Sequence, residues 1–175
     1  MKFEELRKEH IVFSYQTGPN YGIEGDEGGF SIELYGNGNL RYCTYRLFDQ
    51  INSLEMFKLT KDQVEQIYNI IKENGERLAG VPVSLDNGRE HKNSNEIEFL
   101  GHDKIWAWDI RRTFLAVEKI KNYAHYQEYK ENMKWENIVC DVFGQICGCL
   151  RKFGIILSLD SCALSEDCKI RVTWK

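Results

Sequence analysis

The chain has 175 residues, of which 42% are hydrophobic and 29% charged, and its formal net charge is −4. These proportions are ordinary for a globular protein and exclude a chain that is disordered throughout, because the apolar content is large enough to offset the loss of chain entropy. The acidic balance gives no general attraction to phosphate backbones, so we expect no nucleic-acid partner.

The sequence contains no segment that would direct it into or across a membrane. No stretch approaches the ~20 consecutive apolar residues of a membrane span. The first residues, Met1–His10, lack the apolar core of a signal peptide. We therefore expect a cytoplasmic protein with no membrane partner, whose six cysteines stay reduced.

The N-terminal part of the chain predicts strands. Ile11–Tyr15 is a short apolar strand, followed by a glycine-rich, acidic loop over 18–29. Phe30–Tyr35 alternates apolar and polar residues, and Gly36–Asn39 supplies residues that tolerate the positive φ of tight turns. A hairpin between Phe30–Tyr35 and Leu40–Tyr45 follows from this pattern.

The clearest helix is predicted over Thr60–Leu78. Thr60 is a good N-cap, and Gln63 three residues later completes a capping box. Gly75 is expected to interrupt the helix near its end. One face of the helix is apolar and would lie on a core; its residues are Val64, Ile67, Tyr68, Ile70, Ile71 and Leu78.

The C-terminal part predicts a polar loop over Ser84–Asn95, then a hairpin, two helices and a closing hairpin. The first hairpin is expected over Glu96–Leu100 and Lys104–Ile110, and the last over Ile155–Asp160 and Lys169–Trp174. The first helix is expected over about Thr113–Asn132, and the second starts at Trp135 or Asn137 and ends near Phe153. Hairpins imply antiparallel pairing, and helices that do not alternate with strands imply an α+β fold. We expect one α+β domain over 1–175, with a subdivision near 111–134 as the alternative, in which about three helices pack on an antiparallel sheet built from β-hairpins.

Five of the six cysteines lie between Cys140 and Cys168, but their spacing does not favour zinc. On one helix Cys140 and Cys147 would lie about 10 Å apart along the axis, at ~1.5 Å per residue. That separation is too long for thiolates that bind one zinc at ~2.3 Å. We expect buried thiols, with Cys149 in the apolar face, and no metal site or cofactor. A disulfide between Cys162 and Cys168 would fit the closing hairpin but is disfavoured in a reducing compartment.

No catalytic constellation is visible in the sequence. The motifs of serine hydrolases, zinc proteases and P-loop proteins are absent, and the four histidines do not pair at helical spacing. The acidic loop over 18–29 would repel phosphate. That loop, with His91 and His102 in polar loops, leaves open a site assembled from loops.

Two aromatic clusters are the candidates for a binding surface. Trp106 and Trp108 share one face of a strand, where they either form a platform for a ligand or partner or pack beneath a helix. Tyr123, Tyr126 and Tyr129 spread along the polar helix, and tyrosine is enriched at interfaces. The alternative for this helix is a place between core and solvent.

These features favour a non-enzymatic module that binds another protein, and we assign no catalytic, metal-binding or cofactor-binding residue. An inhibitory partner of a basic protein is one form of this hypothesis, suggested by the acidic charge. Two alternatives stay open. One is a small-molecule-binding or hydrolytic enzyme with a site assembled from loops, and the other is a homo-oligomeric structural domain. No motif of the chain is specific to a known family.

Overall fold

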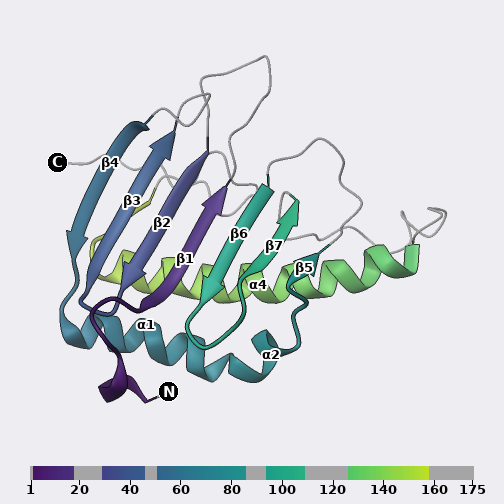
Figure 1. The fold of residues 1–175 in the computed structure, drawn as a ribbon, viewed down its shortest axis with the longest axis horizontal. Helices are drawn as coiled ribbons and strands as arrows, with labels where there is room; N and C mark the ends of the chain where they lie inside the picture. The colour runs from purple at the N-terminus through teal and green to yellow at the C-terminus, as the bar shows by residue number, and fades with distance from the viewer. Residues whose placement is uncertain (1, 18–28, 46–50, 86–93, 109–125, 158–175) are drawn as a thin grey trace.

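A computed structural model describes residues 2–17, 29–45, 51–85, 94–108 and 126–157. They form a seven-stranded sheet of order β4-β3-β2-β1-β6-β7-β5, with helices packed against it (Figure 1). All neighbouring strands are antiparallel except β5 and β7, which are parallel. The expected α+β fold is confirmed.

The elements have the following bounds. The strands are β1 (Ile11–Thr17), β2 (Phe30–Tyr35), β3 (Asn39–Tyr45), β4 (Ile51–Lys58), β5 (Ser84–Leu85), β6 (Ser94–Phe99) and β7 (Ile105–Trp108). The helices are the short 3₁₀ turn η1 (Phe3–Glu5), α1 (Lys61–Glu73), α2 (Gly75–Ala79) and α4 (Tyr126–Lys152). None of these helices is long and apolar enough to cross a membrane.

Local sequence signals determine the first helix as expected. The backbone N–H of Gln63 donates to the Thr60 hydroxyl, and the Gln63 side chain accepts from the Thr60 backbone N–H, so the capping box is confirmed. The predicted interruption is also confirmed, because α1 ends at Glu73 and α2 begins at Gly75. The Asn74 side chain between them donates to the Ile70 carbonyl oxygen.

The core lies between one face of the sheet and the helices. The ring of Phe143, on α4, lies 5.5 Å from that of Phe13 and 5.0 Å from that of Tyr15, both on β1. All three side chains are buried, and burying a large apolar side chain contributes about 1.5–3 kcal/mol. Val64 and Ile67 of α1 belong to the same cluster. Figure 1 shows α4 running across the sheet on one side, with α1 alongside it.

The cysteines of α4 are buried thiols, as expected. Cys140, Cys147 and Cys149 are all buried and free of disulfides. Burial raises the pKa of Cys149, and the nearby Lys152 ammonium offsets this in part. Cys162 and Cys168 lie outside the described residues.

The predicted break between two C-terminal helices is wrong. α4 continues through Trp135, because Met133, Glu136 and Cys140 follow one another at helical spacing as buried positions. The segment 113–125 of the expected polar helix lies outside the described residues.

Two other ranges differ from the sequence-based expectation. Ser84–Asn95 is not entirely loop, because β5 occupies Ser84–Leu85 and β6 begins at Ser94. Residues 155–157 form no strand, and the rest of the predicted closing hairpin lies outside the described residues.

Candidate functional site

The sheet has two unlike faces. Because side chains alternate along a strand, Phe13 and Tyr15 point toward the helices while Ser14 and Gln16 point away from them. The face that carries Ser14 and Gln16 is called the open face, since none of the described helices packs on it.

Strand register arranges the open face into two rows of side chains that cross the sheet. The first row runs from β4 to β6 and consists of Met56, Arg41, Glu33, Ser14 and Glu98. The second row runs from β4 to β5 and consists of Leu54, Cys43, Ser31, Gln16, Glu96, Trp106 and Ser84.

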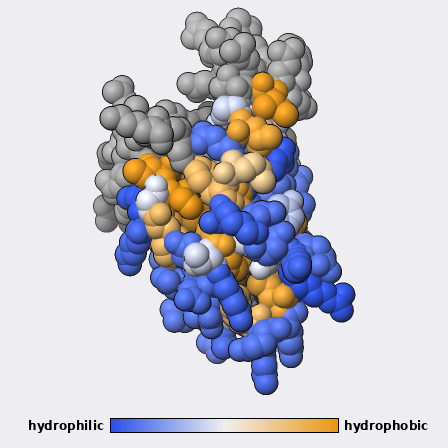
Figure 2. All heavy atoms as spheres, turned by 90° about the vertical axis from the view of Figure 1, so that its left-hand side faces the viewer, coloured by the Kyte–Doolittle hydropathy of each residue, from blue (hydrophilic) through white to orange (hydrophobic). Residues whose placement is uncertain are grey.

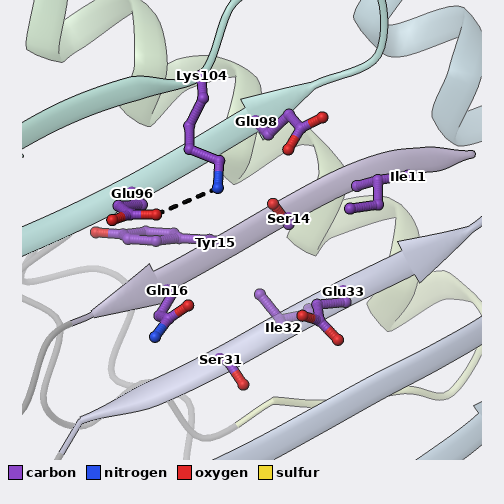
Figure 3. Close-up of a pocket in the computed structure, with 10 residues that line it drawn as sticks. All are labelled: Ile11, Ser14, Tyr15, Gln16, Ser31, Ile32, Glu33, Glu96, Glu98 and Lys104. Carbon is purple, nitrogen blue, oxygen red and sulfur yellow. Dashed lines mark hydrogen bonds and ion pairs between the residues drawn. The ribbon is translucent and has the colours of Figure 1, made fainter. Parts of the chain in front are cut away.

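A shallow depression lies over the middle of these rows (Figure 3). Ser14 stands on β1 between Glu33 on β2 and Glu98 on β6. The cavity volume is about 70 Å³, whereas pockets for drug-sized ligands span roughly 300–1,000 Å³. This depression can therefore take the tip of a side chain and is too small for most substrates.

The depression is acidic. Arg41 pairs with Glu33 at 3.2 Å, and Lys104 pairs with Glu96 at 3.2 Å. Among the described residues, no cation lies within ion-pair distance of Glu98. One negative charge at the centre of the open face is thus uncompensated by the described side chains.

Two tyrosine hydroxyls on the open face make hydrogen bonds to its side chains. Burial raises the pKa of Tyr35, and the Glu33 carboxylate, which accepts a hydrogen bond from the Tyr35 hydroxyl at 3.2 Å, raises it further. Burial also raises the pKa of Tyr45, whose hydroxyl lies 3.0 Å from the Ser31 hydroxyl. Both phenols therefore stay protonated at neutral pH.

Apolar side chains lie on both sides of the acidic centre. Leu54 and Met56, on the edge strand β4, are 50% and 59% exposed. Trp106 is half-buried at the other end, on β7. The open face thus combines an acidic centre with apolar flanks, while Ser31 and Cys43 of the second row are buried.

Of the aromatic candidates, only Trp106 has a side chain within the described part of the structure. Trp106 lies on the open face, opposite Glu96 and Ser84, while Ile105 and Ala107 point into the core. The alternation expected for this strand is therefore correct, and Trp106 does not lie beneath a described helix.

The remaining candidates stay predictions. The backbone of Trp108 pairs with Ser94, but its side chain lies outside the described part. Tyr126 and Tyr129 lie at the start of α4, but their side chains lie outside the described part. Tyr123 lies outside the described residues.

The histidines do not assemble a site in the described part of the chain. His102 lies in the turn from β6 to β7, close to Gly75 of α2, and burial lowers its pKa while Asp103 opposes the shift. Thr17, which precedes the glycine-rich loop, pairs with Asn95, at the end of β6 that lies away from this turn. His91 and the loop itself are outside the described residues. Within the ranges that the structure describes, no group of three or more His, Cys, Asp or Glu could hold a metal ion.

Sequence reasoning missed the acidic centre of the open face. The alternation of Glu96-Ile97-Glu98 and of Ser31-Ile32-Glu33 did indicate polar faces. It gave no sign that β1 would lie between these two strands and bring Glu33 and Glu98 into one row.

Comparison with known proteins gives no family for this chain. No protein-family model matches the sequence, and a search of the curated proteins found no match.

Proposed function

We propose that the protein is a non-enzymatic protein-binding module whose partner docks on the open face and inserts a basic side chain at Ser14. The main support for this proposal is a sheet face that the described helices leave uncovered, with a carboxylate near its centre that forms no ion pair with a described cation.

The geometry favours a basic group of the partner. Neighbouring strands lie about 4.8 Å apart, so the Glu33 and Glu98 positions stand roughly two strand spacings apart on either side of Ser14. A lysine or arginine placed over Ser14 would meet carboxylates from both sides and a hydroxyl beneath. Charge-assisted hydrogen bonds of this kind are roughly twice as strong as neutral ones.

The apolar flanks supply contact area around this charged centre. An interface needs desolvated apolar contacts as well as matched charges, and tryptophan is enriched among the residues that contribute most to binding. Trp106 on one side and Leu54 with Met56 on the other provide such contacts. A partner that covered the acidic centre without a cation would bury an unpaired carboxylate, which weakens binding. The partner should therefore be basic where it contacts this centre.

Site-specific photo-crosslinking tests this proposal. A photoreactive amino acid placed at Gln16, which is exposed at the centre of the second row, should give a discrete adduct with one protein in a lysate of the native cells. The same group placed at Asn69, exposed on α1, should not give that adduct.

Two charge variants show whether the adduct depends on the acidic centre. Glu98→Lys should reduce the adduct formed from Gln16 by about tenfold or more, because like charges across an interface cost several kcal/mol. Glu76→Lys, on the exposed surface of α2, changes the net charge equally and should leave the adduct unchanged. An adduct that forms from Asn69 but not from Gln16, or one that Glu98→Lys leaves intact, would contradict the proposal.

A further inference from the structure

The outer edge of the sheet at β4 is apolar. Ile51, Leu54 and Met56 are 58%, 50% and 59% exposed. Ile51 pairs with Tyr45, Leu54 with Cys43 and Met56 with Arg41, so all three side chains lie on the open face. Figure 2 looks onto this side of the molecule and shows hydrophobic atoms among the polar ones.

The backbone of β4 has bonding groups that face outward. The Leu59 N–H donates to the Gly38 carbonyl oxygen at 2.8 Å. Because hydrogen-bonded pairs alternate along an antiparallel ladder, Phe57 and Glu55 also bond toward β3. The N–H and C=O groups of Leu54 and Met56 then point away from the sheet, where no described strand pairs with them.

The backbone hydrogen bonds between β3 and β2 lead independently to the same bonding pattern for β4. The Tyr45 N–H donates to the Gly29 carbonyl oxygen at 2.9 Å. Because bonding direction alternates along a strand, the backbone groups of Cys43 and Arg41 also bond to β2. Those of Tyr42 and Leu40 then bond to β4. Tyr42 and Leu40 are the register partners of Glu55 and Phe57, as the first bond requires.

The centre of β4 lacks most of the devices that usually prevent strands from pairing, and the register shift between β3 and β4 lies at its Ile51 end. Natural edge strands carry proline, lysine, bulges or short lengths that block edge-to-edge contact. β4 has eight residues, contains no proline and has its only lysine at Lys58, the last position. None of the other described strands pairs with the outer side of its centre, Ser53–Phe57.

We propose that two copies of this chain pair edge to edge through β4, antiparallel and related by a two-fold axis at Leu54. The proposal is independent of the proposed function. The two sheets would form one continuous sheet, with two acidic centres on the same face.

A second copy fits this edge because β4 is self-complementary about Leu54. In an isologous antiparallel pair, residue i faces residue j and residue j faces residue i. The axis at Leu54 places Leu54 opposite Leu54 and Ser53 opposite Glu55, so like charges do not meet. An axis at Glu55 would place two carboxylates opposite each other, which is destabilising.

Sedimentation equilibrium of the whole chain, from micromolar to several hundred micromolar, tests this inference. The wild type should sediment as a dimer at the upper concentrations. Met56→Pro removes an outward N–H, and Met56→Lys places on the edge a lysine of the kind that natural edge strands use to block pairing. Each should weaken dimerisation more than about tenfold, which corresponds to about 1.4 kcal/mol.

Val83→Lys is the matched control. Val83 is also an exposed apolar residue, 54% accessible, and it lies next to β5 at the other end of the sheet. This variant should dimerise as the wild type does. If Met56→Pro does not fold, Met56→Lys decides the question alone. A wild type that stays monomeric, or a dimer that persists in the folded Met56 variants, would overturn the inference.

Discussion

At the scale of single residues, the structure explains two glycines in different ways. Gly38, in the β2–β3 turn, has φ +85°, and a Cβ there would collide with the carbonyl oxygen of Leu59. Gly101, in the β6–β7 turn, has φ +81° with open space around it. Both require left-handed backbone, but only Gly38 is also in close contact with a neighbour.

A pair of alanine variants separates the cost of left-handed backbone from the cost of the close contact with Leu59. Gly101→Ala should lower the free energy of unfolding by about 1–2 kcal/mol, the ordinary cost of left-handed backbone for a residue with a side chain. Gly38→Ala should lower it by about 1–3 kcal/mol more, because the turn must also move away from Leu59. Urea denaturation of both variants measures the difference, and equal losses would show that the close contact has no consequence.

The sequence predicted residue environments wherever a local pattern decides them. The Thr60 cap, the turn at Gly38 and the alternation of Trp106 with Ala107 all follow from neighbouring residues. Glu98 could not be assigned to a site, because its significance depends on Ser14 and Glu33, which are distant in sequence and adjacent only in the sheet.

At the scale of elements, the sequence predicted the first hairpin and α1 but not β4. Ile51–Lys58 is an edge strand in which Ile51, Leu54 and Met56 are exposed and only Phe57 packs against the core. Its pattern therefore differs from the alternation of buried and exposed positions that identifies a strand beneath a helix. The expected division between Asn132 and Trp135 has no counterpart in the structure, where α4 is continuous from Tyr126 to Lys152.

The alternation of backbone bonds along β4 makes a prediction for stability. Glu55→Pro removes an N–H that bonds to β3 and leaves a Tyr42 carbonyl without its donor, whereas Met56→Pro removes an outward N–H. A buried group that loses its hydrogen bond costs about 1–3 kcal/mol. Glu55→Pro should therefore be less stable than Met56→Pro by about that amount.

Thermal and urea unfolding of the two proline variants at low protein concentration measures this difference without a contribution from association. A less stable Met56→Pro would show that the bonding alternation assigned to β4 is reversed, and equal stability would show that the two N–H groups do not differ in bonding.

At the scale of the whole molecule, strand order determines both the core and the open face. β1 lies between β2 and β6, and a buried hydrogen bond of 2.7 Å from the Tyr15 hydroxyl to the Asn95 side chain joins strands that are 80 residues apart in sequence. Composition and periodicity predicted hairpins and an α+β fold. They could not predict this pairing, because register between distant strands depends on tertiary packing.

The same strand order makes the acidic centre a property of the assembled sheet. β2 supplies Glu33, β1 supplies Ser14 and β6 supplies Glu98. The proposed function therefore depends on the folded sheet and not on any short motif.

Amide chemical-shift mapping with a short arginine-rich peptide tests the acidic centre most directly. We expect the largest shifts at Ser14, Gln16, Ser31 and Glu98, and we expect them to diminish with added salt as screening increases. They should be lost in Glu98→Lys and retained in Glu76→Lys. Shifts that are equally large on the exposed side of α1, at Asn69 and Glu73, or that persist in Glu98→Lys, would contradict the claim that the open face binds a basic partner.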